Sequence, residues 1–194
     1  MNGISVYPLT PDRWDDFADL FGERGACGGC WCTFFKLPHK EYRLFAGEQA
    51  RELQRQWVEG GLVPGLLAYD GDQAVGWIAL EPREAYPRLE RSRVSRRVDD
   101  QEVWSVVCFF TRKSHRGRGV SVMLLRAGLE HARKMGGKIV EGYPVEVNAG
   151  KAPDPFVFPG LPGAFRAAGF TEVARFSPTR PIFRYTLEAQ DDHA

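Results

Sequence analysis

Apolar and polar residues alternate along this chain in two different rhythms, which predict a mixture of strands and helices. Apolar residues at every second position predict strands, and apolar residues three and four apart predict helices. The turn Asp70-Gly71-Asp72 separates two strand patterns and predicts a hairpin. In the first part of the chain we expect strands at 4–9, 65–69 and 74–80 and helices at 12–21 and 47–59.

Residues 101–136 contain the most informative pattern of the chain. Residues 104–110 are apolar except for Ser105, which predicts a strand that is covered on both faces and lies centrally in a sheet. A helix with one apolar stripe is expected to start at Val120. If the strand alternates regularly, its two faces carry Trp104, Val106, Cys108 and Phe110 on one side and Val107 and Phe109 on the other.

A basic turn with two glycines, Arg116-Gly117-Arg118-Gly119, joins this strand to this helix. The N-terminus of a helix presents unpaired backbone amides and a partial positive charge. Glycine lets an anion approach the backbone closely, and arginine supplies fork-shaped donors for phosphate oxygens. The order strand, turn, helix therefore predicts a pyrophosphate site; the alternative is an ordinary surface turn. The sequence contains neither the P-loop motif nor the dinucleotide-binding glycine motif.

The segment 109–125 resembles the cofactor motif of the GNAT superfamily, the acyl-CoA-dependent N-acetyltransferases, whose pattern is Gln/Arg-x-x-Gly-x-Gly/Ala. Gly117 and Gly119 fill its two small positions, and Ser114 stands where glutamine or arginine is usual. The resemblance implies an α/β (α+β) fold, with a mixed, mostly antiparallel central sheet and helices on both faces. It also implies that the central strand and its parallel neighbour splay apart, and that acetyl-CoA, the acyl donor, lies in the gap.

The resemblance assigns the cofactor to main-chain groups at specific positions. Phe109 and Thr111 correspond to the backbone partners of pantetheine. The implied reaction moves an acetyl group to an amine by direct attack, which needs a base, a donor for the oxyanion and an acid for the thiolate. The backbone of residues 109–111 is the candidate oxyanion donor. The pyrophosphate is assigned to Arg116, Gly117, Arg118, Gly119, Val120 and Ser121.

The family resemblance does not supply the proton donor. Many members have a tyrosine four residues before a Gly-Phe pair; here that pair is Gly169-Phe170, and the residue is Phe165. We expect Tyr143 to act as the acid, because it ends the strand that should flank the thioester. Glu141, two residues earlier on the same face, is the expected base. The alternatives are that Tyr143 only forms a wall and that Glu141 pairs with an arginine.

Three cysteines within six residues, Cys27, Cys30 and Cys32, form an unusual cluster, with His39 nearby. Three thiolates and an imidazole could hold zinc. Structural zinc sites usually bring a second, separated ligand pair, however, and the sequence lacks one. We therefore expect no metal, and we expect this loop to pack beside aromatic side chains and to line the acceptor pocket.

The stretch 83–100 contains six arginines among four acidic residues. Such charge runs favour a solvated connection with internal ion pairs. The alternative is an arm that reaches the 3′-phosphate of the cofactor or an acidic acceptor. Farther on we expect a strand at 138–145, a functional loop at 143–163, a short helix at 163–168 and a final pair of strands at 170–176 and 181–187.

The composition is that of a soluble globular protein. The 194 residues are 43% hydrophobic and 26% charged, so we expect one domain at 1–188 and a frayed polar tail at 189–194. A net charge of +1 argues against a general nucleic-acid binder. The sequence has no apolar run of membrane-spanning length and no signal-peptide pattern, so the cytoplasm is the expected compartment.

The expected activity is that of an acyltransferase, a GNAT-type N-acetyltransferase acting on a small-molecule or peptide amine. We expect neither nucleic acid nor membrane as a partner, and a homodimer is compatible with the sequence. Two other classes stay open. One is a degenerate module that binds acyl-CoA as a sensor or scaffold without transfer. The other is a metal-binding regulatory domain centred on Cys27, Cys30 and Cys32.

Overall fold

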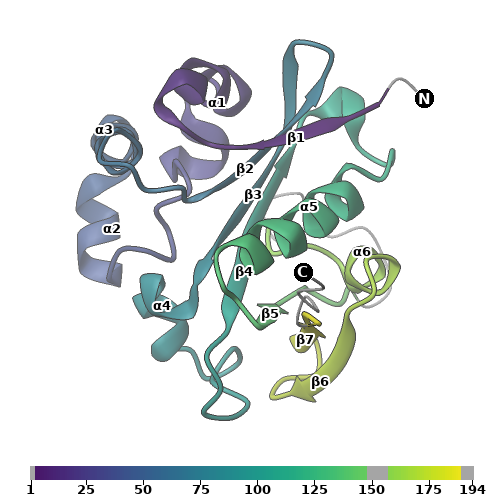
Figure 1. Cartoon of the computed structure of the whole chain (residues 1–194). Helices are drawn as coiled ribbons and strands as arrows, with labels where there is room; N and C mark the ends of the chain where they lie inside the picture. Colours follow the sequence, from purple (N-terminus) through teal and green to yellow (C-terminus); the bar gives the residue numbers. More distant parts are fainter. Residues whose placement is uncertain (1–2, 148–156, 189–194) are drawn as a thin grey trace.

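A computed structural model describes residues 3–147 and 157–188, which fold around one sheet (Figure 1). Its seven strands stand in the order β1-β2-β3-β4-β5-β7-β6. Neighbouring strands are antiparallel, except β4 and β5, which are parallel. This is the mixed, mostly antiparallel sheet that the sequence predicts. The strands are β1 (Ser5–Pro8), β2 (Gly65–Asp70), β3 (Gln73–Pro82), β4 (Trp104–Thr111), β5 (Ile139–Gly142), β6 (Thr171–Arg175) and β7 (Pro181–Thr186).

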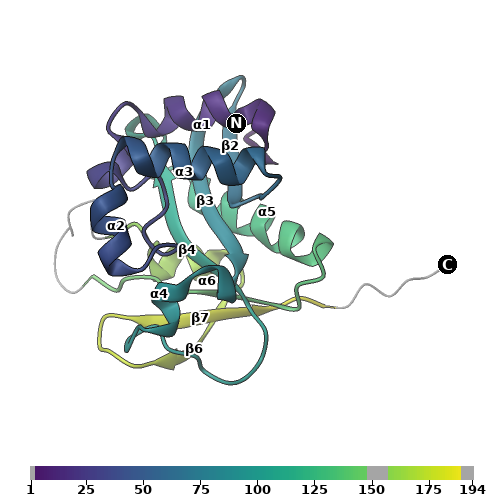
Figure 2. The same ribbon diagram turned by 90° about the vertical axis from the view of Figure 1, so that its left-hand side faces the viewer.

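Helices cover both faces of the sheet, as expected (Figure 1, Figure 2). α1 and α3 lie on one face and α5 lies on the other. The helices are α1 (Trp14–Phe21), α2 (His39–Phe45), α3 (Glu48–Glu59), α4 (Pro87–Glu90), α5 (Val120–Lys134) and α6 (Pro162–Ala167). Short helical turns are η1 (Pro11–Arg13), η2 (Gly25–Gly29), η3 (Arg83–Ala85) and η4 (Lys113–His115).

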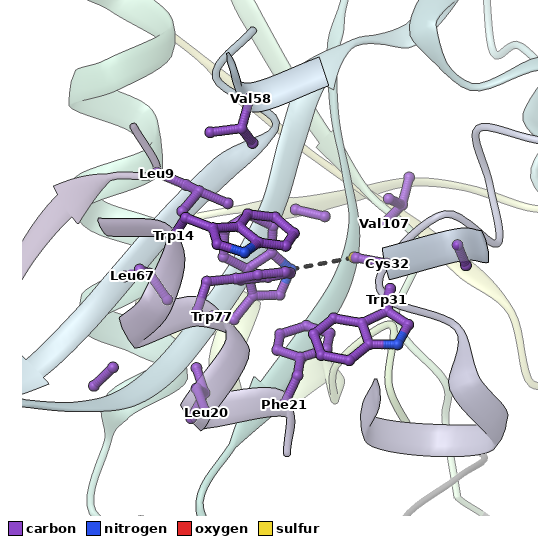
Figure 3. Close-up of a cluster of buried hydrophobic side chains, with 14 of the residues drawn as sticks. Leu9, Trp14, Leu20, Phe21, Trp31, Cys32, Val58, Leu67, Trp77 and Val107 are labelled. Atoms are coloured by element: carbon purple, nitrogen blue, oxygen red, sulfur yellow. Dashed lines mark hydrogen bonds between the residues drawn. The ribbon is translucent and has the colours of Figure 1, made fainter. Parts of the chain in front are cut away.

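An aromatic cluster fills the space between the sheet and α1 (Figure 3). Trp77 of β3 is fully buried, and its ring centroid lies 4.8 Å from that of Phe17 and 6.2 Å from that of Phe21. Trp31, from the cysteine-containing loop, stacks on Phe21 at 5.9 Å. Burial of a side chain of this size contributes about 1.5 to 3 kcal/mol. Aromatic packing therefore fixes this loop to the core.

The opposite face of the sheet packs against α5. Gly76 of β3 allows the helix to come close, because a Cβ at this residue would lie 2.7 Å from the Val120 side chain. This contact fixes the N-terminus of α5 against β3. The apolar stripe of α5 is buried through Val120, Leu124, Leu125, Leu129 and Ala132.

A β-bulge interrupts β4 and overturns the regular alternation predicted for that strand. Ala79 of β3 pairs with Cys108 and Leu80 pairs with Val106, so Val107 has no partner on β3. Before the bulge, Val106 packs toward α5; after it, Cys108 packs toward α1. The predicted faces are therefore wrong beyond Val107, because one extra residue shifts the phase of the strand.

The same point marks the divergence of β4 and β5. Their parallel pairing joins Trp104, Ser105 and Val106 to Val140, Glu141 and Gly142. β4 then continues to Thr111, whereas β5 ends at Gly142. The two strands therefore separate, as the family resemblance implies.

Two short helices, α2 and α4, were not predicted. They have 7 and 4 residues, which is too few to show a helical period in the sequence. β5 is also shorter than the strand predicted at 138–145. The tail predicted at 189–194 and residues 148–156 of the predicted loop lie outside the described residues. Within the described part of the chain, no helix is long and apolar enough to cross a bilayer.

Candidate active site

The turn between β4 and α5 has the backbone geometry of an anion site. Gly117 and Gly119 have φ values of 72° and 78°, in the left-handed region that favours glycine. A Cβ added to either glycine would meet no heavy atom of the described residues within 4 Å. The glycines are therefore needed for the path of the chain, and the space in front of them is open.

The first turn of α5 presents unpaired amides beside this open space. Within the described part of the chain, no acceptor pairs with the backbone amides of Gly119, Val120 and Ser121. α5 is 15 residues long, and its N-terminus carries a partial positive charge. Arg118 is exposed next to these amides. The residues predicted to hold pyrophosphate, 116–121, therefore lie together and can bind an anion.

Polar contacts anchor the segment before the turn. Nε of Arg116 donates to the Thr111 carbonyl at 3.2 Å. Ser114, where the family usually has glutamine or arginine, places its hydroxyl 2.9 Å from Nδ1 of His115. The other ring nitrogen of His115 lies 3.2 Å from Oδ2 of Asp70, in the β2–β3 hairpin. Ser114 therefore helps to anchor the turn, and the arginines of the turn supply its positive charge.

Residues 158–160, called the gap segment below, lie in the gap between β4 and the residues that follow β5. The Phe109 amide donates to the Phe158 carbonyl at 2.6 Å, and the Val145 amide donates to the Gly160 carbonyl at 2.9 Å. A Cβ at Gly160 would lie 2.9 Å from the Phe109 ring, so only glycine fits there. The Phe109 amide, which the resemblance assigns to pantetheine, is thus bonded to the protein's own backbone in this structure.

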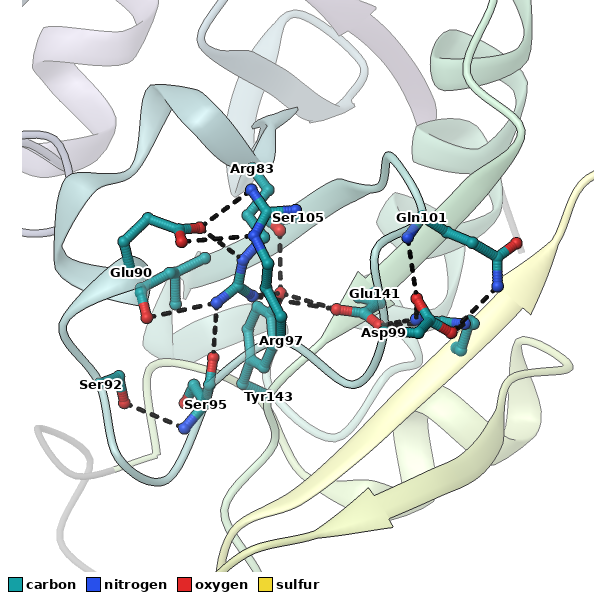
Figure 4. Close-up of polar contacts among 12 residues, drawn as sticks. Arg83, Glu90, Ser92, Ser95, Arg97, Asp99, Gln101, Ser105, Glu141 and Tyr143 are labelled. Atoms are coloured by element: carbon teal, nitrogen blue, oxygen red, sulfur yellow. Dashed lines mark hydrogen bonds and ion pairs between the residues drawn. The ribbon is translucent and has the colours of Figure 1, made fainter.

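Tyr143 follows β5, and its hydroxyl lies inside a buried polar network (Figure 4). The hydroxyl accepts from Nη1 of Arg83 at 2.7 Å, donates to Oε2 of Glu141 at 3.1 Å and lies 2.9 Å from Oγ of Ser105. Burial, followed by the charge of Glu141, raises the pKa of Tyr143 well above its usual value. The hydroxyl therefore keeps its proton at neutral pH.

Both carboxylate oxygens of Glu141 accept hydrogen bonds. Oε1 accepts from Nη2 of Arg184 in β7 at 2.6 Å, and Oε2 accepts from Tyr143. Arg184 also donates to both oxygens of Asp99, and these hydrogen bonds hold the pKa of Asp99 well below its ordinary value. The structure therefore contains the pairing of Glu141 with an arginine that was the alternative to a free base.

Arg83 is a buried member of this network, so the prediction of a solvated stretch is wrong for its first residue. Arg83 is 1% exposed, and its guanidinium donates to Glu90, to Tyr143 and to two backbone carbonyls. A buried guanidinium is tolerated when its donors find partners. The rest of the stretch holds the expected internal ion pairs, such as that between Arg97 and Glu90 at 3.2 Å.

Three network residues were missed by reasoning from the sequence: Arg83, Ser105 and Arg184. Ser105 interrupts an otherwise apolar strand, and this interruption is a signal that could have identified it. The two arginines give no local signal, because their network partners lie 60 and 43 positions away along the chain.

Phe165 closes one side of the gap. It is fully buried, and its ring centroid lies 6.0 Å from that of Phe109 and 5.2 Å from that of Phe170. A Cβ at Gly142 would lie 2.0 Å from the Phe165 ring. The position where many family members have a tyrosine is therefore packed with an apolar ring that carries no proton to transfer.

A cleft of about 320 Å³, lined by aromatic and basic residues, adjoins the gap, and part of its lining comes from α2 and α4. Phe34 and Phe35 line it, and their ring centroids lie 6.0 and 6.1 Å from that of Phe158 in the gap segment. The cysteine-containing loop therefore lines a cleft through its aromatic residues. The described residues that line it are Phe34, Phe35, Pro38, His39, Pro87, Arg88, Arg91 and Ser92.

The cysteines of this loop have packing contacts. Sγ of Cys32 accepts a hydrogen bond from Nε1 of Trp77 at 3.1 Å (Figure 3). Burial raises the pKa of Cys30 to about 11, so this thiol stays protonated. Within residues 3–147 and 157–188, no three potential metal ligands gather. The absence of a metal stays a prediction that metal analysis of the protein will test.

The fold and the turn together give a glycine turn at a helix N-terminus that follows a strand leaving its parallel neighbour. Residues 31–149 match the model of the acetyltransferase (GNAT) family. The chain belongs to this family, as the sequence resemblance suggested. No curated protein matches the sequence significantly.

Solved structures with a similar fold come from several organisms. A GNAT-family acetyltransferase of Listeria monocytogenes is 11% identical, with a TM-score of 0.57 and 95% of each chain covered. A mosquito arylalkylamine N-acetyltransferase-like protein is 12% identical, with a TM-score of 0.56, covering 95% of this chain and 100% of its own. The PaiA N-acetyltransferase of Thermoplasma acidophilum, solved with coenzyme A, is 11% identical, with a TM-score of 0.54, covering 95% and 99%. These likenesses confirm the predicted fold class.

Proposed function

We propose that the protein transfers an acetyl group from acetyl-CoA to the amine of an acceptor. The observation that carries this proposal is the open turn at Gly117 and Gly119, which leads into the unpaired amides of α5. It stands directly after the strand that separates from β5. The amides and arginines suit the pyrophosphate of CoA, and the part of β4 beyond its pairing with β5 suits the pantetheine arm. Membership of the GNAT family supports the same reaction class.

In this proposal, acetyl-CoA and the Phe158 carbonyl compete for the Phe109 amide. The amide donates to Phe158 at 2.6 Å, so pantetheine can pair with β4 at this residue only after the gap segment has moved. The exchange replaces one hydrogen bond by another and has a small net cost at the amide itself. Once released from Phe158, this amide can donate to one acceptor at a time, either a pantetheine carbonyl or the oxyanion.

Tyr143 is the residue that we propose as the acid for the departing thiolate. It follows β5 where the two strands separate, and its hydroxyl carries a proton, which it donates to Glu141 in this structure. Glu141 already accepts hydrogen bonds on both oxygens, so we assign it a positioning role rather than that of a free base. It orients the Tyr143 hydroxyl together with Arg83. The proton of the acceptor ammonium then leaves through water.

A turnover assay tests the proposal. Acetyl-CoA is incubated with the protein and a panel of amines, while release of the CoA thiol and formation of the acetamide are followed by absorbance and mass spectrometry. Amine-dependent CoA release with an N-acetylated product is the expected result. Binding of acetyl-CoA without product from any amine class would reject transfer.

A sensor or scaffold that binds acyl-CoA without transfer is the second candidate. One observation favours it, the hydrogen bond between the Phe109 amide and Phe158, which occupies the proposed oxyanion donor. The same assay separates the two candidates, because a sensor binds acetyl-CoA and makes no acetamide.

A further inference from the structure

The cleft beside the gap carries positive charge, and the described residues that line it include no acid. Two other arginines of the stretch 83–100 pair with carboxylates, whereas Arg96 stacks on Phe176. Arg83 and Arg97 both pair with Glu90, at 2.9 and 3.2 Å. Among the described residues, the lining of the cleft thus contains two arginines and no carboxylate. The polar side chains of its lining are His39, Arg88, Arg91 and Ser92.

Arg88 is anchored in the wall of the cleft, and one buried nitrogen of its guanidinium has no hydrogen-bond partner among the described residues. Its Nε donates to the Leu37 carbonyl at 2.9 Å, and its guanidinium lies 4.0 Å from the ring centroid of Phe34 and 5.0 Å from that of Tyr42. Nη2 of Arg88 is buried and has no hydrogen-bond partner among the described residues. A buried donor without a partner is costly, and a ligand anion would remove that cost.

Arg91 supplies a second positive charge at the same cleft. It is exposed, and it makes no ion pair with any carboxylate of the described residues. The acid beside it in the chain, Glu90, is already paired with Arg83 and Arg97. Arg91 can therefore bind a ligand at the solvent-exposed side of the cleft, and Arg88 can bind it beside the Phe34 ring.

The aromatic wall connects the cleft to the gap between β4 and β5. Phe34 and Phe35 contact the ring of Phe158, and the Phe158 carbonyl accepts from the Phe109 amide. A ligand with an anion at the arginines and an apolar body against Phe34 and Phe35 would direct its remaining end toward the gap, where the thioester is proposed to lie.

We propose that this cleft binds the acceptor, and that the acceptor is an amino-carboxylate: a small molecule with a carboxylate for Arg88 and Arg91, an apolar or aromatic body and the amine to be acetylated. The inference rests on the proposed acetyl transfer and names its substrate class. A volume of about 320 Å³ suits a molecule of amino-acid size. The fork of a guanidinium matches a carboxylate in geometry as well as in charge.

Matched pairs of amines test the inference by binding and by turnover. Phenylalanine is compared with phenethylamine, which lacks only the carboxylate, and O-phosphoethanolamine is compared with ethanolamine. Calorimetry in the presence of CoA gives affinities, and the acetamide assay gives turnover. A charge-assisted hydrogen bond contributes a factor of about 10 to 100 in affinity. We expect phenylalanine to bind at least about tenfold more tightly than phenethylamine.

Variants of the arginines test whether the preference for a carboxylate arises in the cleft. Arg91→Gln and Arg88→Gln are expected to reduce the preference for the carboxylate to less than about threefold. Arg93→Gln is the matched control, because Arg93 is exposed in the same stretch and does not line the cleft. Arg91 is exposed, so its variant stays informative if loss of the buried Arg88 contacts unfolds the protein.

The outcomes separate the inference from the proposed function. Equal affinity for the two members of the phenylalanine pair, or a carboxylate preference that survives in both cleft variants, would overturn the inference. A preference for the phosphate pair alone would also overturn it. A carboxylate preference in binding with no acetamide formed would support the cleft assignment and reject the transferase. Acetylation of both amines at equal efficiency would support the transferase and reject the assignment.

Discussion

Replacement of Phe158 by alanine tests whether the gap segment competes with the cofactor. The Phe158 ring contacts Phe34 and Phe35 at centroid distances of 6.0 and 6.1 Å, and these contacts hold its carbonyl against the Phe109 amide. Phe158→Ala removes the ring and keeps the backbone. The variant therefore weakens the closed arrangement without changing any group that we assign to the cofactor.

The size of the effect follows from the two ring contacts. An aromatic pair contributes about 0.5 to 1.5 kcal/mol beyond its buried area, so two pairs contribute about 1 to 3 kcal/mol to the closed arrangement. The apparent dissociation constant is the intrinsic one divided by the fraction of molecules that are open. When the closed state dominates, a loss of 1 kcal/mol raises the open fraction about fivefold. We expect acetyl-CoA to bind to Phe158→Ala about fivefold more tightly, or better.

Titration calorimetry with acetyl-CoA measures this change. Phe176→Ala is the matched control, because Phe176 is a half-buried phenylalanine that stacks against Arg96 and, among the described residues, has no ring contact with Phe158. Its affinity should equal that of the wild type. Unchanged or weaker binding in Phe158→Ala would show that the segment does not obstruct the cofactor, and that our account of the gap is mistaken.

Three further predictions follow from the site and the loop. Tyr143→Phe should lower kcat by about 100-fold with little change in the KM for acetyl-CoA, since it removes a proton donor; steady-state kinetics with an unaffected kcat would assign the proton to solvent. Arg184 lowers the pKa of Asp99 below its unfolded value of about 4, so this pair stabilises the fold above that pH and loses its effect as pH falls. Asp99→Asn should therefore lower the Tm at pH 7, with a smaller difference at pH 3, whereas Asp100→Asn should change little. Purified protein should contain no stoichiometric zinc by metal analysis; zinc that survives dialysis and disappears in Cys30→Ser would contradict the packing role.

The elements that could be predicted are those whose signal is local. Residues 104–110 are apolar on both faces, and the helix from Val120 has a clear stripe, so the central strand, the turn and the helix after it follow from neighbouring residues. The bulge at Val107 could not be seen, because the extra residue is as apolar as those around it. Its effect on the strand's faces therefore required the structure.

The candidate site depends more strongly on distant contacts. Arg83 and Tyr143 are separated along the chain and meet only because β3 and β5 flank β4. The contact between Phe109 and Phe158 likewise depends on how a loop returns to the sheet. The positive φ values at the turn could be expected from its glycines, whereas the hydrogen-bond partner of each backbone group could not.

Binding of acetyl-CoA at the turn is the central claim, and one titration tests it most directly. Gly119 has a φ of 78° and open space in front of it, so Gly119→Asp places a strained backbone and a negative charge where the pyrophosphate should lie. Gly136→Asp, at a positive φ of 81° after the far end of α5, is the matched control. We predict that calorimetry detects acetyl-CoA binding to the wild type and to Gly136→Asp and none to folded Gly119→Asp. Wild-type affinity in Gly119→Asp would contradict the account.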